Sequence, residues 1–166
     1  MRLPLAIAVG LLISLGSNVP ALSQLSQPAV QVAQTRANQS NIGRLQVNRQ
    51  LWQKQKITNY RYTLTRSCFC TTEAREPVVV EVRNGVTTAV TSVATGKPVD
   101  RELFKEYDTV PKLFNVIQDA IKRKASSLTV KYDSKFGYPT QINVDYDRQM
   151  ADEELYLIVE KFQVIK

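Results

Sequence analysis

Hydrophobic and polar residues recur along this chain with two different periods, and each period predicts a kind of element. Ile42, Leu45 and Trp52 recur at helical spacing, which predicts a first helix beginning at Ile42. From residue 60 to residue 65, apolar and polar side chains alternate, as they do in a strand with one buried face. The folded part of the chain is therefore expected to start with a helix followed by a strand.

A hairpin is predicted after this strand. Two Val-rich runs, 78–83 and 86–93, are separated by Asn84-Gly85. Both central positions of a type I′ turn take positive φ, which Asn and Gly tolerate, so the two runs are expected to pair as neighbouring antiparallel strands. Residues 94–107 contain glycine and proline without apolar periodicity and are expected to form a loop.

The most regular helical pattern lies in the middle of the chain. Asp108 or Thr109 can cap this second helix, and Pro111 suits its first turn. Its apolar positions, all at helical spacing, are Val110, Leu113, Phe114, Ile117, Ala120 and Ile121. A helix with one apolar stripe packs against the rest of the domain.

Three further strands are predicted after the second helix, at 128–132, 142–146 and 155–159, because apolar residues alternate there. The last is apolar on both faces, so we expect it at the centre of the sheet. The order α-β-β-β-α-β-β-β with short connections predicts one α+β domain over residues 42–166. Its antiparallel sheet would have about six strands, with two helices on one face.

The N-terminus has the pattern of a secretory signal peptide. Arg2 precedes an apolar run over residues 3–15, and Ala21-Leu22-Ser23 fits a small-x-small cleavage site. A retained membrane anchor is the alternative, but the run is shorter than the roughly 20 residues that span a bilayer. We therefore expect a signal peptide over 1–23, a flexible lead-in rich in Gln, Ser and Asn over 24–41, and a periplasmic or secreted protein without a membrane span after cleavage.

The net charge of +7 does not by itself indicate a nucleic-acid partner. The bases are scattered, whereas nucleic-acid readers concentrate them in a patch or stripe. The single run, residues 122–124, lies where the second helix should end, and cations there interact favourably with the helix dipole. We expect no nucleic-acid partner, while weak attraction to anionic envelope surfaces stays open.

The chain contains no histidine, which removes the usual Ser-His-Asp and Cys-His catalytic systems and imidazole zinc sites. Two acidic groups are candidate carboxylate pairs for acid–base catalysis: Asp145 with Asp147, and the run 152–154. Alternation places the first pair on a solvent-facing strand surface, and the second precedes an element start. We therefore expect no catalytic residues, no metal site and no cofactor.

Cys68-Phe69-Cys70 holds the only two cysteines. Along an extended strand, the Cα atoms of residues i and i+2 lie roughly 6.5 Å apart, near the upper limit for a disulfide. A bridge would therefore bend the strand or lie at its end. Three hypotheses stay open: a structural disulfide, a redox-active dithiol with Arg66 favouring thiolate, or a soft-metal site such as one for copper(I).

Several local patterns together resemble a known family. They are the strand leading into Cys68-x-Cys70, the Asn84-Gly85 hairpin and the turn Gly137-Tyr138-Pro139. Over roughly Leu51 to Phe162, the chain resembles the domain-of-unknown-function family numbered 6174, a group of exported bacterial proteins. The resemblance implies one exported domain with two cysteines as a regular feature, and it implies no activity.

These observations favour a non-catalytic exported protein that binds an envelope protein or a small ligand. The alternative is a thiol–disulfide or soft-metal-binding protein that uses Cys68 and Cys70. The sequence names neither the ligand nor the partner.

Overall fold

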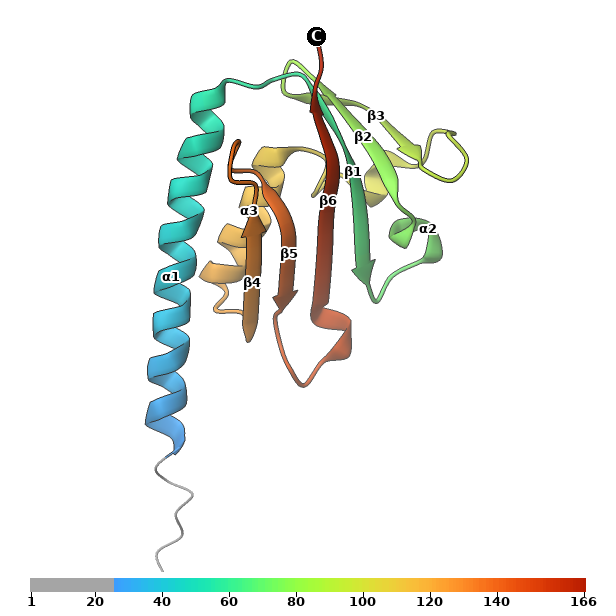
Figure 1. Cartoon of the computed structure of the whole chain (residues 1–166). Coiled ribbons are helices and arrows are strands. Elements are labelled where there is room, and N and C mark those ends of the chain that lie inside the picture. The colour runs from blue at the N-terminus through green and yellow to red at the C-terminus, as the bar shows by residue number, and fades with distance from the viewer. Residues whose placement is uncertain (1–25) are drawn as a thin grey trace, which may run out of the picture.

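A computed structural model describes residues 26–166 of the chain (Figure 1). The predicted signal peptide, 1–23, lies outside the described residues. The elements are α1 (Ser26–Gln55), β1 (Tyr60–Cys68), α2 (Thr72–Arg75), β2 (Val78–Arg83), β3 (Val86–Ser92), the 3-10 turn η2 (Arg101–Leu103), α3 (Val110–Lys122), β4 (Ser127–Tyr132), β5 (Pro139–Asp145), the 3-10 turn η3 (Ala151–Glu153) and β6 (Glu154–Val164). The predicted α+β class and the order of its main elements are confirmed.

The six strands form one antiparallel sheet in the order β3-β2-β1-β6-β5-β4. Each half of the chain contributes three consecutive strands, and the halves join where β1 pairs with β6. This arrangement confirms the central position that apolar residues on both faces predicted for the last strand. The first and last strands thus share the middle of the sheet (Figure 1).

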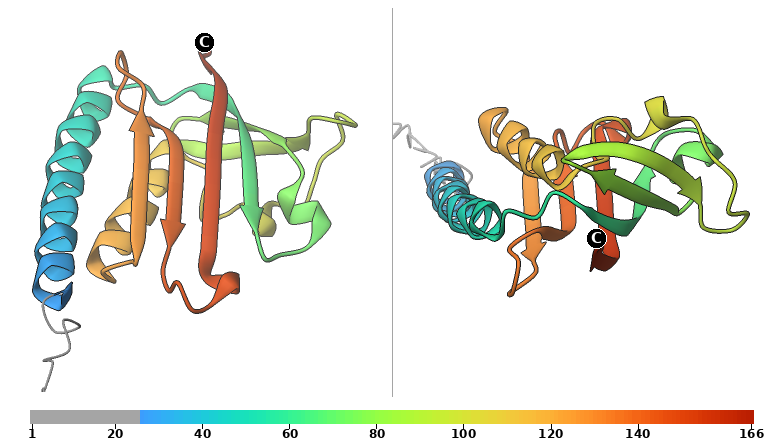
Figure 2. Two further views of the ribbon diagram at one scale, coloured as in Figure 1. Left: turned by 60° about the horizontal axis from the view of Figure 1, so that its bottom comes forward. Right: turned by 90° about the horizontal axis from the view of Figure 1, so that it is seen from above.

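The hydrophobic core lies between the sheet and α3. Tyr60, Tyr62 and Leu64 of β1 point into it, as do Val78, Val80 and Val82 of β2, all nearly inaccessible. Helix α3 contributes its apolar stripe, and Thr109 caps it by accepting a hydrogen bond from the Lys112 backbone N–H at 3.3 Å. Among residues 26–166, no helix covers the opposite face of the sheet (Figure 2), which we call the open face.

Helix α1 runs beside α3 and the edge strand β4 (Figures 1 and 2). Leu45 and Trp52 are its buried anchors. Asn41 Nδ2 donates to the Leu128 carbonyl at 3.2 Å, and Arg44 Nη2 donates to the Val130 carbonyl at 2.7 Å. These side chains donate to backbone carbonyls of β4 that would otherwise lack partners at the edge of the sheet.

The start of α1 differs from the sequence expectation. The helix begins at Ser26, whereas apolar spacing placed its start at Ile42 and a flexible lead-in over 24–41. Residues 26–41 are rich in Ala and Gln, which are favourable helix formers, but they have no apolar face to reveal the period. Among residues 26–166, no helix combines the length and the hydrophobicity that crossing a membrane requires.

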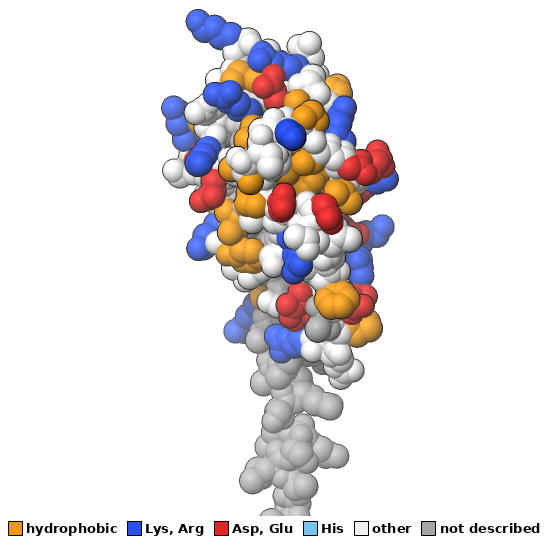
Figure 3. Space-filling model, turned by 90° about the vertical axis from the view of Figure 1, so that its right-hand side faces the viewer, with side chains coloured by type: hydrophobic (Ala, Val, Ile, Leu, Met, Phe, Trp, Pro, Cys, Tyr) orange, Lys and Arg blue, Asp and Glu red, His pale blue; other side chains and the backbone are white. Residues whose placement is uncertain are grey.

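Basic side chains are dispersed over the surface seen from the β2–β3 side rather than joined in one patch (Figure 3). Acidic and hydrophobic side chains lie among them in the same view. This face therefore offers no continuous basic stripe of the kind that tracks a nucleic-acid backbone.

Candidate functional site

The Cys68-Phe69-Cys70 segment forms a tight turn where β1 ends. Strand β1 finishes at Cys68, and the Cys70 backbone N–H donates to the Cys68 carbonyl at 3.0 Å, closing a three-residue turn around Phe69. The structure joins the two cysteines in a disulfide with Cα atoms 5.4 Å apart, closer than the roughly 6.5 Å of an extended strand. The Phe69 side chain is left 83% exposed at the tip.

Arg66 does not serve the cysteines in this arrangement. Its guanidinium donates to the carbonyls of Ala74 at 3.1 Å and Leu103 at 2.8 Å. It also lies 5.6 Å from the ring centroid of Phe104 and 5.4 Å from that of Tyr107. Arg66 therefore fastens α2 and η2 to β1, and the hypothesis that it favours a thiolate loses its structural basis.

Two pockets adjoin the disulfide, one on each side of the sheet. The larger has a volume of about 530 Å³ and lies between α3 and the start of β6. The smaller, of about 350 Å³, lies on the open face. Cys68, Glu154 and Leu155 line both pockets. We call the disulfide turn and these two pockets the disulfide end of the molecule.

One wall of the larger pocket is a cluster of charged and aromatic side chains. Tyr146 Oη donates to Asp119 Oδ2 at 3.2 Å, and the Arg123 guanidinium lies 3.8 Å from the centroid of the Tyr146 ring. Arg123 also reaches Asp119 at 3.7 Å and Glu153 at 3.6 Å. Burial, together with the nearby Asp119 carboxylate, raises the pKa of Tyr146 to about 12, so its hydroxyl stays protonated.

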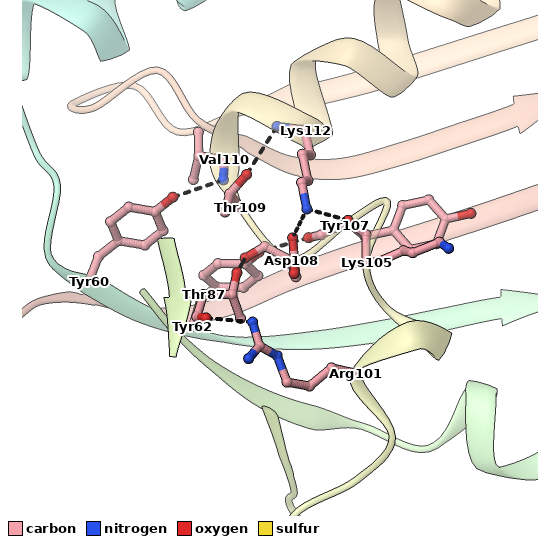
Figure 4. A network of polar contacts seen from close by, with 10 residues as sticks. All are labelled: Tyr60, Tyr62, Thr87, Arg101, Lys105, Tyr107, Asp108, Thr109, Val110 and Lys112. Carbon is pink, nitrogen blue, oxygen red and sulfur yellow. Dashed lines mark hydrogen bonds and ion pairs between the residues drawn. The ribbon is translucent and has the colours of Figure 1, made fainter. Parts of the chain in front are cut away.

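The opposite wall is held by a buried polar network (Figure 4). Tyr62 Oη donates to the Tyr107 carbonyl at 2.8 Å, which fixes the residue whose side chain lines the pocket. Tyr60 Oη accepts from the Val110 backbone N–H at 3.0 Å at the start of α3. Burial raises the pKa of Tyr60 to about 12 and that of Tyr62 well above its usual value, so both phenols remain neutral hydrogen-bonding groups.

The same network positions Lys112, a second lining residue. Lys112 Nζ pairs with the buried carboxylate of Asp108 at 2.7 Å and donates to the Lys105 carbonyl at 2.6 Å (Figure 4). Thr87 Oγ1 donates to the Asp108 carbonyl at 2.8 Å, and Arg101 Nη2 donates to the Thr87 carbonyl at 2.5 Å. The loop before α3 is therefore bound to β3 and forms a fixed wall.

The disulfide end is acidic although the chain is basic. Six of the fifteen Asp and Glu residues line its two pockets: Glu106, Asp119, Asp145, Asp152, Glu153 and Glu154. The Lys and Arg residues among the lining side chains are Lys112 and Arg123, and both are already ion-paired. The local charge is thus opposite in sign to the net charge of +7.

The residues singled out from the sequence are distributed over both ends of the sheet. Cys68 and Cys70 lie at the disulfide end. Gly137-Tyr138-Pro139 lies at the other end, where a Cβ on Gly137 would come within 2.5 Å of the Asn48 carbonyl oxygen of α1. This turn signature is therefore a packing feature of α1, separate from the pockets.

Sequence reasoning missed most of the pocket walls. Tyr146 was expected only as the last residue of a strand, Arg123 as part of the basic run at a helix end, and Tyr107 in a loop. No local pattern marks these residues, because elements far apart in sequence bring them together. Within the described part of the chain, no group of three His, Cys, Asp or Glu side chains could hold a metal ion.

Comparison with family models matches residues 44–164 to the family described as "Family of unknown function (DUF6174)". The comparisons with curated proteins and with solved structures gave no match. The matched range includes the disulfide, all six strands and α3.

Proposed function

The chain belongs to the family of unknown function DUF6174, and we propose that it is an exported, non-catalytic binding domain whose ligand site is the larger pocket of the disulfide end. The observation that carries this proposal is the pocket itself. Its volume of about 530 Å³ falls within the range of ligand sites, and its lining combines Tyr107 and Tyr146 with charged groups fixed in place.

A binding role fits the chemistry of the pocket better than catalysis. The Asp119 carboxylate is engaged by Tyr146 and Arg123, and Lys112 is paired with Asp108. A general base needs a free, suitably titrating group within reach of a substrate proton. These side chains instead hold one another in a fixed arrangement, which suits recognition of a preformed shape. The other lining carboxylates, Glu106, Asp152 and Glu154, are exposed and lie outside this arrangement.

Export rests on two independent supports. Residues 1–23 have the composition of a signal peptide. The structure also pairs Cys68 with Cys70, a bond that persists in oxidising compartments outside the cytoplasm. Intact-mass measurement on protein from the native cell envelope tests both: we expect a chain beginning near residue 24 that lacks two hydrogens relative to the dithiol form. A full-length, reduced chain would overturn export.

The ligand we favour is a segment of another envelope protein, with a small molecule as the alternative. A photo-crosslinking residue at exposed Asn115, which lines the larger pocket, tests this in the native cell. The matched control carries the same probe at exposed Thr88 on β3. Val116→Trp fills the pocket from α3, where Val116 is half-buried.

We expect a cross-linked protein with the probe at Asn115, none at Thr88, and loss of the product when Val116→Trp is added. A small ligand would instead appear as extra mass on the native protein that Val116→Trp removes. Cross-linking that is equal at both positions, or that is unaffected by filling the pocket, would count against the proposal.

A thiol–disulfide role is the second candidate, because Cys68 lines both pockets and the disulfide therefore borders open space. A redox titration against glutathione separates the two functions. A reduction potential below about −300 mV is typical of structural disulfides and would eliminate the redox role. The soft-metal variant requires the reduced pair, and no His, Asp or Glu among the described residues completes a three-ligand group with it.

A further inference from the structure

We propose that the smaller pocket of the disulfide end binds an organic cation, namely a primary ammonium or guanidinium group. This pocket of about 350 Å³ lies on the open face of the sheet, where β4, β5, β6 and the end of β1 lie side by side. Its polar lining side chains come from Ser67, Ser127, Asn143, Asp145, Glu154 and Tyr156. The site goes beyond the proposed function, because Asp145 does not line the larger pocket.

Asp145 is the central observation. Its Oδ1 atom is buried and has no hydrogen-bond partner among residues 26–166. A buried carboxylate oxygen without a donor is destabilising, because desolvation is not offset by any bond. The charge of a carboxylate is shared by both oxygens, so a cation on the accessible side of the group would offset this penalty.

The sheet register adds a second acidic group. Asp145, the last residue of β5, lies directly opposite Glu154, the first residue of β6. Side chains at directly opposed positions project to the same face with Cβ atoms about 5 Å apart, and like charges in this arrangement repel. Among the described residues that line the pocket, none is Lys or Arg. No basic side chain in the lining of the pocket therefore offsets the two negative charges.

Two aromatic side chains of the pocket favour an organic cation over a metal ion. Phe69 forms part of the wall and is 83% exposed. The three-residue turn and the disulfide between its two neighbours constrain its backbone. Tyr156 lies on β6 beside the two carboxylates. Aromatic faces attract ammonium and guanidinium groups, and the Asn143 amide oxygen can accept a remaining N–H bond.

Other ligand classes fit this pocket less well. An anion would meet two carboxylates and no base. A calcium ion takes six to eight oxygen ligands, and magnesium demands near-ideal octahedral geometry. The described residues contain no group of three candidate metal ligands. The aromatic rings can contact the carbon atoms of an organic cation, and the two carboxylates can accept hydrogen bonds from its N–H groups.

The same chemistry could come from a lysine or arginine side chain of another protein or from a free amine. Three probes separate these sources in titrations of the oxidised whole protein followed by amide chemical shifts. They are butylammonium, a terminally blocked Gly-Gly-Lys-Gly-Gly peptide, and n-butanol as the neutral analogue. We expect the shifts to map to Phe69, Asn143 and Asp145 for both cations and to be absent with n-butanol. Tighter binding of the peptide would identify a protein side chain as the source, and tighter binding of butylammonium a free amine.

Asp145→Asn removes the charge with almost no change in shape. We expect it to weaken butylammonium binding at least tenfold and, without any probe, to raise the unfolding temperature by about 1–3 °C, because the repulsion across the strands is relieved. Glu160→Gln is the matched control. It removes one negative charge from an exposed position of the neighbouring strand β6, and binding should be unchanged.

Phe69→Ala keeps the test decisive if Asp145→Asn fails to fold, because Phe69 is exposed and its truncation leaves the core intact. We expect it to weaken the binding of the cations about threefold, in line with a solvent-exposed cation–π contact. Equal binding of n-butanol, or full-strength binding by Asp145→Asn, would overturn the proposal. Neither result bears on the larger pocket, whose test uses Asn115 and Val116.

Discussion

The two ends of this sheet are built from the same strands, but one end is closely packed and the other contains pockets. At one end, β1 begins and β6 finishes in a cluster of packed aromatic rings, which we call the aromatic end. There, Trp52 lies 5.3 Å from Tyr60, and Phe162 lies 4.4 Å from Tyr138, measured between ring centroids. At the disulfide end, β1 finishes and β6 begins beside two pockets, an exposed Phe69 and a carboxylate oxygen that has no hydrogen-bond partner in the described part of the chain.

The two ends differ in how completely their side chains are buried and hydrogen-bonded. Trp52, Tyr60 and Tyr138 are buried around the half-buried Phe162. The Tyr60 hydroxyl accepts a hydrogen bond from the Val110 backbone N–H. A sequence specifies one stable structure when its apolar side chains are packed and its polar groups are paired. Exceptions, such as open pockets and unpaired polar atoms, are expected at functional sites. The aromatic end is therefore where we expect stability to reside, and the disulfide end is where we expect recognition.

Truncating one aromatic residue at each end tests this contrast with the largest expected effect. Trp52→Ala should lower the free energy of unfolding by about 3–5 kcal/mol, because it removes a buried ring that contacts three others. Phe69→Ala should change it by less than about 0.5 kcal/mol, since the ring is exposed. Urea unfolding followed by circular dichroism measures both. Similar losses at the two ends would contradict the comparison.

Alkaline pH should act on the aromatic end through Tyr60. Its pKa is raised by burial to about 12, above the unfolded value of about 10. Its contribution to stability is therefore complete below pH 10 and is lost as pH rises from about 10 through 12, amounting to about 3 kcal/mol for a two-unit shift.

Tyr60→Phe isolates this contribution, since phenylalanine does not titrate. The stability advantage of the original chain over the variant should shrink between pH 10 and pH 12 when unfolding free energies are compared at matched pH. An advantage that stays constant across this range would show that the Tyr60 phenol ionises as freely in the folded chain as in the unfolded one.

Most of the fold could be predicted from the sequence because its strands and α3 carry strong periodic patterns. The apolar residues on both faces of β6 placed it centrally, and Asn84-Gly85 marked the hairpin. The start of α1 was missed because residues 26–41 have no apolar face. The short helix α2 was missed because it spans only Thr72–Arg75, too few residues to show a period.

The site was less accessible to sequence reasoning. The cysteine pair and the end of β1 were identified, because two thiols two residues apart restrict the backbone. Asp145 was placed correctly on the open face, yet the expectation that it faces solvent was incomplete, since one of its oxygens is buried. Alternation gives the face of a side chain, whereas pockets depend on the relative positions of β5, β6 and the turn at Phe69.

Gly137 offers a finer test at the aromatic end. It has φ of +79°, and a Cβ would lie 2.5 Å from the Asn48 carbonyl oxygen, whereas Gly96 has φ of +67° with nothing within 4 Å. Alanine at Gly96 should cost about 1 kcal/mol for the left-handed backbone alone. Alanine at Gly137 should cost at least about 1 kcal/mol more, because α1 must move away from the turn. Unfolding monitored by Trp52 fluorescence measures the difference, and equal losses would mean that α1 yields without penalty.

Removing the disulfide should cost less stability than Trp52→Ala, the ionisation of Tyr60 or Gly137→Ala. A bridge between residues two apart closes a very short loop, so its contribution through the unfolded chain is about 1.5 kcal/mol at most. The Cys68→Ser, Cys70→Ser double variant should therefore lose no more than that in urea unfolding, and the original chain under reducing conditions should behave alike. Because the turn around Phe69 also has the backbone hydrogen bond from Cys70 to Cys68, the end of β1 should keep its shape.

A loss comparable to that of Trp52→Ala would show that the disulfide end stabilises the whole domain. A small loss accompanied by weaker binding of butylammonium would show that the bridge serves to hold Phe69 at the rim of the smaller pocket.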